Sequence, residues 1–343
     1  MVRGKRVFTL GLALILALGT FTGCGKENAK SSNSVEITNV SYDPTRELYE
    51  AYNVEFAKYW KEKTGQEVTV TQSHGGSGKQ ARAVVEGNEA DVVTLALAHD
   101  ITAIENAGLI QSGWIDEFEK NSSPYTSTIV FLVRKGNEKN IKDWDDLVKD
   151  GVEVITPNPK TSGGACWNFL SAWSYADNLY SGDEAKIKEF VGDLYRNVIV
   201  LDSGARGATT TFVENGQGDV LIAWENEAYL SVKEHPEEYE IITPSISILA
   251  EPSVAVVDEV AKDRGTEEVS KAYLEYLYSD IGQHIAGDNF YRPSNPEILK
   301  EYADVFNLGI HMVSIDDFDG WDKAYEKFFQ DKAIFDQIYN VEQ

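Results

Sequence analysis

Short apolar runs rich in β-branched residues alternate with amphipathic helical patterns along most of this chain. The first repeat of this alternation is a strand pattern at 35–40, a helical face at 48–60 and a second strand pattern at 67–71. A helix between two strands returns the chain to the starting edge of a sheet, so that the strands run parallel. The alternation therefore predicts an α/β architecture with doubly wound, mainly parallel sheets.

One strand-to-helix turn has residues suited to holding an anion. The β-branched run 154–157 leads through a Pro-rich turn into a helical pattern that begins near Ser162. Ser162 is a preferred N-cap residue, and Gly163 and Gly164 let the backbone approach a ligand closely. The first N–H groups of a helix lack partners, and the helix dipole favours an anion there. The turn predicts an anion cradle, although the same residues also suit an ordinary capped helix.

Two long extended runs, 125–134 and 248–257, enclose a block of further strands and helices. This arrangement indicates one domain inserted into another, with the two runs as crossings. A chain of 343 residues is long enough for two domains of ordinary size. We therefore expect one lobe formed by 35–125 and 253–343 and a second lobe formed by 126–252.

The chain is strongly acidic, with a formal net charge of −25 at pH 7. This charge argues against nucleic acid or an anionic membrane surface as a partner. It also makes the protein a poor electrostatic trap for anions in general. An anion site in this chain must therefore depend on local dipoles and hydrogen bonds.

The N-terminal segment 1–23 has the features of a secretory signal. Basic residues precede an apolar run at 7–21 that is too short to span a membrane, and small residues then precede Cys24. The junction resembles the bacterial lipoprotein signal, in which the cysteine becomes the acylated first residue, with Phe21 where Leu is usual. Residues 24–34 form a polar tether. We expect an extracytoplasmic protein that is attached to the cell membrane only through lipid on Cys24.

Several other chemistries have little support in the sequence. With Cys24 used for lipid, Cys166 has no partner in the chain, which excludes a disulfide and a thiolate metal cluster. The five histidines are scattered without metal-ligand spacing. Gly78-Lys79 lacks the flanking residues of a phosphate-binding loop, and a His74–Cys166 nucleophilic pair would lack an orienting group. We expect no metal, no cofactor and no enzymatic activity.

Six segments together resemble the sulfate-binding proteins of bacterial sulfate ABC importers. They are 39–47, 72–80, 157–165, 202–207, 218–226 and 291–293. The resemblance extends from about residue 35 to the last residues. It implies a two-lobe periplasmic-binding-protein fold of type II, joined by crossover strands, that closes over one dehydrated sulfate held by neutral groups. It also implies a monomer that delivers sulfate to the permease of an ABC transporter.

The same resemblance implies which groups hold the ligand. They are the backbone N–H groups of Asp43, Ser77, Gly163, Gly164 and Ala205, the hydroxyl of Ser162 and the indole N–H of Trp224. All of these groups can donate, which suits a ligand made only of acceptors. Trp224 taken alone is more typical of a core residue, and the Asp43 carboxylate could instead cap a helix. Arg206, beside Ala205, is expected to lie outside direct contact with the anion.

Two alternatives stay open at this point. The thiosulfate-preferring branch of the same family overlaps in ligands; it often carries another aromatic residue at the position of Trp224 and departs from Ser-Gly-Gly, which favours sulfate here. An exported hydrolase of sulfate or phosphate esters is a different class of protein. Such an enzyme needs a nucleophile and usually a metal, and the sequence offers no cluster of that kind.

We predict that Cys24→Ala moves the protein from the membrane fraction to the soluble fraction and leaves ligand binding unchanged. The reason is that the tether after Cys24 has no apolar content that could hold a membrane by itself. Detergent-phase partitioning of the wild type and the variant measures this. Equal partitioning of the two would contradict the lipid anchor.

Overall fold

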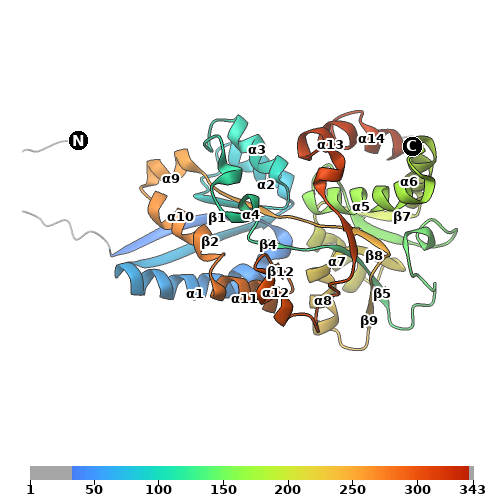
Figure 1. The fold of residues 1–343 in the computed structure, drawn as a ribbon, viewed down its shortest axis with the longest axis horizontal. Helices are drawn as coiled ribbons and strands as arrows, with labels where there is room; N and C mark the ends of the chain where they lie inside the picture. Colours follow the sequence, from blue (N-terminus) through green and yellow to red (C-terminus); the bar gives the residue numbers. More distant parts are fainter. Residues whose placement is uncertain (1–32, 340–343) are drawn as a thin grey trace, which may run out of the picture. The chain divides into compact units, whose positions relative to one another are not determined.

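Two separate β-sheets organise residues 33–339, which are the residues that the computed structural model describes (Figure 1). A four-stranded sheet has the strand order β11-β3-β1-β2, and a five-stranded sheet has the order β7-β6-β8-β5-β9. In the first sheet β1 pairs in parallel with β2 and β3, and in the second sheet β6 pairs in parallel with β7 and β8. The predicted α/β architecture with mainly parallel sheets is confirmed.

The four-stranded sheet is built from two separate parts of the chain, one early and one late. Its strands are β1 (Ser34–Tyr42), β2 (Glu67–Gly75), β3 (Val92–Leu95) and β11 (Ser253–Val256). The helices around it are α1 (Arg46–Thr64), α2 (Ser77–Val85), α3 (Ala98–Asn106), α4 (Glu119–Ser122), α9 (Asp258–Arg264) and α10 (Glu267–Tyr276). β3 is buried along its whole length and β11 pairs with it in the antiparallel direction. A strand covered on both faces explains the continuous apolar run in the sequence.

Helix α1 is held against the first sheet by aromatic side chains. Tyr52 and Phe56 lie one turn apart and are both fully buried. Their ring centroids lie 5.1 and 5.0 Å from that of Tyr273 in α10. The helix ends at Gly65, whose φ of 74° is the left-handed conformation that glycine adopts without strain. The helical face predicted from the spacing of the apolar residues therefore becomes the contact between α1 and α10.

The five-stranded sheet is built from the middle of the chain. Its strands are β5 (Ile129–Arg134), β6 (Val154–Pro157), β7 (Val198–Asp202), β8 (Val220–Trp224) and β9 (Tyr239–Ile242). Its helices are α5 (Gly163–Tyr180), α6 (Glu184–Arg196), α7 (Ala205–Val213) and α8 (Glu225–Glu234). β6 pairs in parallel with β7 and β8, whereas β5 pairs with β8 and β9 in the antiparallel direction. α5 and α7 therefore begin at the carboxyl ends of the parallel strands β6 and β7.

The two long extended runs do not form single strands. The first divides into β4 (Tyr125–Thr126) and β5, and the second contains the end of β10 (Ile246–Ile248) and β11. An antiparallel bridge joins Ser127 to Ala250 between these pieces, so the two runs pass each other between the sheets. β4 also pairs with β12 (Arg292–Pro293), which belongs to a third connecting segment. The division of the lobes at 125/126 and 252/253 stays a prediction.

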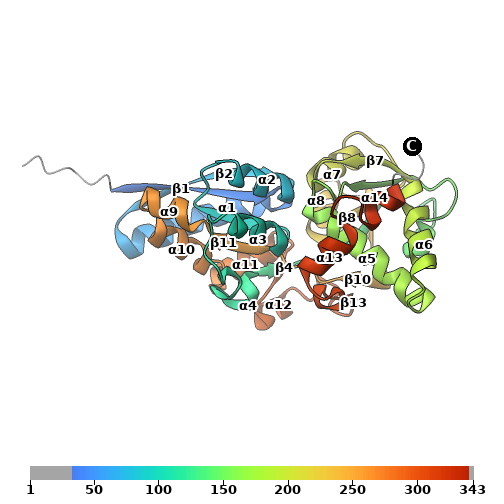
Figure 2. The ribbon, with the colours of Figure 1, turned by 90° about the horizontal axis from the view of Figure 1, so that it is seen from above.

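The sequence prediction places 253–343 in one lobe, and this assignment stays a prediction. After α11 (Asp280–Asp288) and α12 (Pro296–Glu301), strand β13 (His311–Val313) pairs in parallel with β10. Helices α13 (Trp321–Phe328) and α14 (Ile334–Tyr339) lie beside α5 and α6, as both views show (Figures 1 and 2). The aromatic rings of Phe328 and Phe335 pack on Phe169 of α5. Segment 311–339 therefore packs on elements of the five-stranded sheet, while α13 also contacts α3, where the ring of Tyr325 stacks on that of His99.

The 3-10 turns of the fold are η1 (Asp43–Thr45), η2 (Trp114–Asp116), η3 (Trp144–Asp146) and η4 (Ile315–Phe318). Within residues 33–339, no helix is long and apolar enough to cross a membrane. The predicted signal segment 1–23 and the proposed lipid attachment residue Cys24 lie outside the described residues.

Candidate functional site

The first turns of three helices from the two sheets meet at one place. α2 begins at Ser77, α5 at Gly163 and α7 at Ala205. A Cβ added at Gly163 would lie 3.1 Å from Cβ of Ser77, and one added at Gly164 would lie 3.6 Å from Cβ of Ala205. These distances place the N-terminus of α5 in contact with those of α2 and α7. The structure thus brings together four of the residues predicted to hold the ligand.

The backbone N–H groups at this meeting point are unused. Among the hydrogen bonds of residues 33–339, none has the N–H of Ser77, Gly163, Gly164 or Ala205 as donor. Each helix N-terminus also carries the positive end of a helix dipole, equivalent to roughly half an elementary charge. An anion placed here would therefore meet several oriented donors without any cationic side chain.

Ser162 and Trp224 border the same meeting point. Ser162 has the backbone conformation of an N-cap, but its hydroxyl makes no capping bond and no other hydrogen bond within the described part of the chain. Its Oγ would lie 3.5 Å, and Nε1 of Trp224 3.0 Å, from a Cβ added at Gly164. The indole N–H donates to the carbonyl of Gly164 at 3.3 Å, which is the long end of the hydrogen-bond range. Both side chains are buried and can donate to an acceptor at this place.

The hydroxyl of Ser77 is already committed elsewhere. It donates to the carboxylate of Asp100 and accepts the N–H of Ala96 at 3.0 Å. Burial raises the pKa of Asp100 to about 6, although the hydrogen bond from Ser77 lowers it in part. Because the hydroxyl is held in this way, only the backbone N–H of Ser77 faces the meeting point. The partnership with Asp100 was not predicted, and the sequence gives no spacing that would link the two residues.

The carboxylate of Asp43 does not cap the helical turn that Asp43 begins. It is the first residue of η1, and Tyr42 occupies the N-cap position instead. Its carboxylate accepts the backbone N–H of Arg206 at 3.1 Å, so it caps α7 across the two sheets. Burial raises the pKa of Asp43, although backbone hydrogen bonds and Arg206 partly oppose the shift. The carboxylate thus takes the capping role that the sequence left open, but on a distant helix, and ligand contact through the N–H stays a prediction.

Arg206 is fully occupied by carboxylates, as expected for a residue outside direct contact with an anion. Its guanidinium forms a bidentate pair with Glu47 of α1 at 2.8 and 2.7 Å. It also pairs with Glu227 of α8, at 3.0 Å from Nε and 2.8 Å from Nη2. Glu47 and Glu227 were missed by the sequence reasoning, because three residues so far apart in the chain show no local pattern.

His74 and Cys166, considered in the sequence as a nucleophilic pair, each have another partner in the structure. His74 lies 2.6 Å from Oγ of Ser41 through Nδ1, and burial lowers its pKa to about 4. Cys166 is buried with its Sγ 3.4 Å from the carbonyl of Pro159, and burial raises its pKa. In the range 33–339, no group of three or more His, Cys, Asp or Glu side chains could hold a metal ion.

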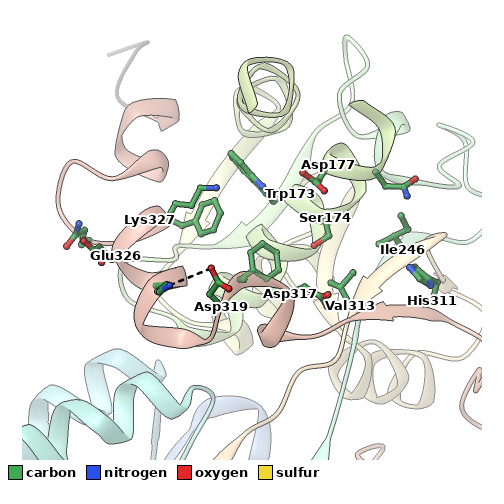
Figure 3. A pocket seen from close by; sticks show the side chains of 15 residues that line it. Trp173, Ser174, Asp177, Ile246, His311, Val313, Asp317, Asp319, Glu326 and Lys327 are labelled. Atoms are coloured by element: carbon green, nitrogen blue, oxygen red, sulfur yellow. Dashed lines mark ion pairs between the residues drawn. The ribbon is translucent and has the colours of Figure 1, made fainter. Parts of the chain in front are cut away.

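A cavity of about 830 Å³ lies elsewhere, between α5, β13 and α13 (Figure 3). None of the predicted ligand-binding residues lines it. Its charged lining consists of Asp177, Asp317, Asp319, Glu326, Lys323 and Lys327, with His311 at the edge. Carboxylates outnumber the ammonium groups, so this cavity is a poor place for an anion. The convergence of helix N-termini is the better candidate despite the size of this cavity.

Comparison with known proteins identifies clear relatives. Residues 45–292 match a family described as bacterial extracellular solute-binding protein. The chain is 58% identical over 309 residues to a sulfate-binding protein of Escherichia coli (strain K12), covering 90% of this chain and 94% of that protein. It is 47% identical over 339 residues to a thiosulfate-binding protein of Pseudomonas aeruginosa, covering 98% of this chain and 99% of that protein.

A solved structure agrees with these sequences. The sulfate-binding protein of Mycobacterium tuberculosis H37Rv superposes with a TM-score of 0.77 at 31% identity, covering 86% of this chain and 100% of that chain. A ferric binding protein from Campylobacter jejuni superposes with a TM-score of 0.58 at 18% identity, which indicates a shared fold only. Both comparisons support the two-lobe type of solute-binding fold.

We predict that Gly163→Ala destabilises the protein by about 1–3 kcal/mol, the usual cost of overpacking. The added Cβ would lie 2.8 Å from Cγ of Leu97 and 3.0 Å from Cβ of Ala96. Chemical denaturation measures the free energy of unfolding. The matched control is Gly192→Ala within α6, where the nearest atom lies 3.7 Å away and alanine should stabilise the helix by about 0.5–1 kcal/mol. A Gly163→Ala variant as stable as the wild type would mean that α5 does not contact the first sheet this closely.

Proposed function

This chain belongs to the family of bacterial extracellular solute-binding proteins, and from that premise we propose that it binds inorganic sulfate. Membership places it outside the cytoplasm and among binding proteins of ABC importers, not among enzymes. The single observation that carries the proposal is the convergence of unused N–H groups at the first turns of α2, α5 and α7. A fully deprotonated oxyanion has only acceptors, which this set of donors matches.

The proposed shell contains seven donors and no cationic side chain. They are the N–H groups of Asp43, Ser77, Gly163, Gly164 and Ala205, the Ser162 hydroxyl and the Trp224 indole N–H. Helix dipoles and hydrogen bonds replace the water that the dianion loses. The Trp224 N–H would exchange its long bond to Gly164 for a charge-assisted bond to a sulfate oxygen. Such a shell also explains how an acidic protein could hold a dianion.

We place this sulfate in a cleft between the two lobes that closes around it. The support is a set of bonds that link elements of one sheet to elements of the other near the site. Trp167 of α5 donates through Nε1 to the carbonyl of Ala96 at 2.9 Å. Arg206 of α7 pairs with Glu47 of α1 at 2.7 Å. These groups would part when the lobes open and meet again when they close.

The further steps of the proposal concern delivery and anchoring. The sulfate-loaded monomer would dock on the permease of an ABC transporter, which is the context of its relatives. Lipid on Cys24 would hold it at the membrane, and the tether that follows would let the binding domain reach the permease. Neither step needs a cofactor or a metal.

Thiosulfate is the second candidate ligand, because a relative named as a thiosulfate-binding protein covers almost the whole chain. Thiosulfate replaces one oxygen by sulfur, which is a weaker hydrogen-bond acceptor. A shell of N–H and O–H donors that closes on all oxygens therefore favours sulfate. Calorimetric titration with each ion distinguishes the two readings by the order of the dissociation constants.

We predict that Trp224→Phe keeps the fold and weakens sulfate binding by about 1.5–3 kcal/mol, or roughly 10- to 150-fold. The reason is that one hydrogen bond to a charged group is lost, while phenylalanine still places an aromatic ring at this position. Ser162→Ala should cost a similar amount, and the two losses need not add, since both donors serve one ion.

Calorimetry of the purified variants measures these changes. The control is Trp60→Phe in α1, whose indole N–H donates to Gln66 at 3.0 Å far from the site, and which should leave the dissociation constant unchanged. If Trp224→Phe bound sulfate as tightly as Trp60→Phe does, Trp224 would not belong to the shell.

We also predict that phosphate binds more weakly than sulfate by at least about three orders of magnitude, and that sulfate binding varies little between pH 5 and 8. Monohydrogen phosphate keeps an O–H that needs an acceptor, and a buried O–H facing only donors costs free energy. Competition of labelled sulfate by phosphate at pH 5 and pH 8 measures this. Phosphate competing within about tenfold of sulfate would contradict the all-donor shell, and the Asp43 carboxylate would then be the first acceptor to consider.

A further inference from the structure

The segment 291–293 belongs to the motifs of the sequence but has no part in the proposed ligand shell. Its central residue, Arg292, is 2% exposed, and its partner Glu225 is 1% exposed. Nε of Arg292 donates to Oε2 of Glu225 at 2.7 Å, and Nη2 donates to Oε1 at 2.9 Å. This is a buried, bidentate ion pair, which fixes the orientation of both planar groups.

The guanidinium of Arg292 is held on its other sides as well. Nη2 also donates to the carbonyl of Asn307 at 3.1 Å, and the ring of Phe306 lies 5.2 Å from the guanidinium carbon. The backbone of Arg292 pairs with Thr126 in the short sheet of β12 and β4. Arg292 is therefore a fixed point in the segments that connect the two lobes.

Glu225 joins that fixed point to the proposed ligand shell, because it directly follows Trp224. Trp224 ends β8, and Glu225 begins α8. The N–H of Glu225 donates to the carbonyl of Thr128 at 2.9 Å, and Trp224 is paired with Ile129 in the sheet. Among residues 33–339, the side chain of Glu225 is hydrogen-bonded to Arg292 alone. This ion pair thus fixes the side chain of the residue at which the chain turns from β8 into α8.

The neighbouring residue Tyr291 reaches Trp224 by a second route. The hydroxyl of Tyr42 donates to that of Tyr291 at 3.3 Å. The ring of Tyr42 in turn lies 5.3 Å from the ring of Trp224 at an angle of 52°. Tyr291 and Arg292 therefore act on the two sides of Trp224, one on its ring and one on its backbone.

Stability alone is a weak explanation for the buried ion pair. The cost of removing two charges from water often cancels their attraction, and well-packed apolar residues are frequently as stable. What such a pair does supply is a unique geometry, since both charges are unsatisfied in any other arrangement. At this position the residue whose geometry the pair fixes, Glu225, directly follows the proposed donor Trp224.

We propose that Arg292 is a positioning residue for ligand binding: by holding Glu225 it sets the direction of the Trp224 indole N–H toward the bound anion. The inference rests on the proposed function for its ligand, sulfate. It assigns to Arg292 no contact with the anion itself.

A double-mutant cycle tests the proposal. Arg292→Met should raise the sulfate dissociation constant about tenfold in the wild-type background. In the Trp224→Phe background, where the N–H is absent, the same change should have an effect of less than about twofold. If Arg292→Met folds poorly, the variant Arg292→Met/Glu225→Met takes its place in the cycle, because it leaves no unpaired buried charge. It should show the same two effects on the dissociation constant. Equal losses in both backgrounds would overturn the proposal, because they would mean that Arg292 acts independently of Trp224.

The matched control is Arg264→Met, which breaks another ion pair with a fully buried carboxylate. Arg264 pairs with Asp91 at 2.7 Å in the first lobe, away from Trp224. This variant should lower the stability of the protein and change the sulfate dissociation constant by less than about twofold. A tenfold loss in Arg264→Met as well would show that broken ion pairs weaken binding generally, which would overturn the specific role of Arg292.

A second readout does not need sulfate and so separates the two proposals. Indole N–H signals of the seven tryptophans can be recorded by ¹H–¹⁵N NMR, with that of Trp224 identified by its loss in Trp224→Phe. The Trp224 signal should move in Arg292→Met and should stay in place in Arg264→Met. If this happens while the wild type fails to bind sulfate, the positioning role stands and the proposed ligand is wrong. An unmoved Trp224 signal in Arg292→Met would overturn the positioning role, whatever the protein binds.

Discussion

Unpaired N–H groups at the first turns of helices are the constraint on which the rest of this structure depends. No α-helix can satisfy them internally, so a fold that buries several helix N-termini together must supply an acceptor or leave them facing one space. Here α2, α5 and α7 follow strands of two different sheets, and the fold brings their first turns together. The same crowding explains the small residues at these turns, since a Cβ at Gly204 would lie 2.5 Å from the Asp43 carboxylate.

Charged side chains surround this centre but are neutralised by one another. Arg206 is divided between Glu47 and Glu227, and Arg292 is committed to Glu225. The Arg206–Glu47 pair links elements of the two sheets, while the field at the centre comes from peptide dipoles. A net charge of −25 is therefore compatible with binding a dianion, because charge serves to position the site and not to attract the ligand.

The sequence predicted those parts of the fold and site whose signals are local. The turn at 158–164 could be interpreted from residue types alone, since capping residues and glycines act within one turn. The capping of α7 by Asp43 could not, because donor and acceptor are separated by 163 positions. The hydroxyl bond of Ser77 to Asp100 and the addition of β13 beside β10 depend likewise on tertiary contacts. The ligand role of the shell residues came from the family resemblance and stays a prediction.

The packing of segment 311–339 on elements of the five-stranded sheet also has a consequence for the order in which the chain folds. Lys160, two residues before Ser162, is held by the carbonyls of Phe329 and Gln330 at 2.9 and 3.1 Å and by Asp336. Nearly the whole chain must leave the ribosome before these contacts can form. The part of the fold around Lys160 therefore cannot be completed while the C-terminus is still being made.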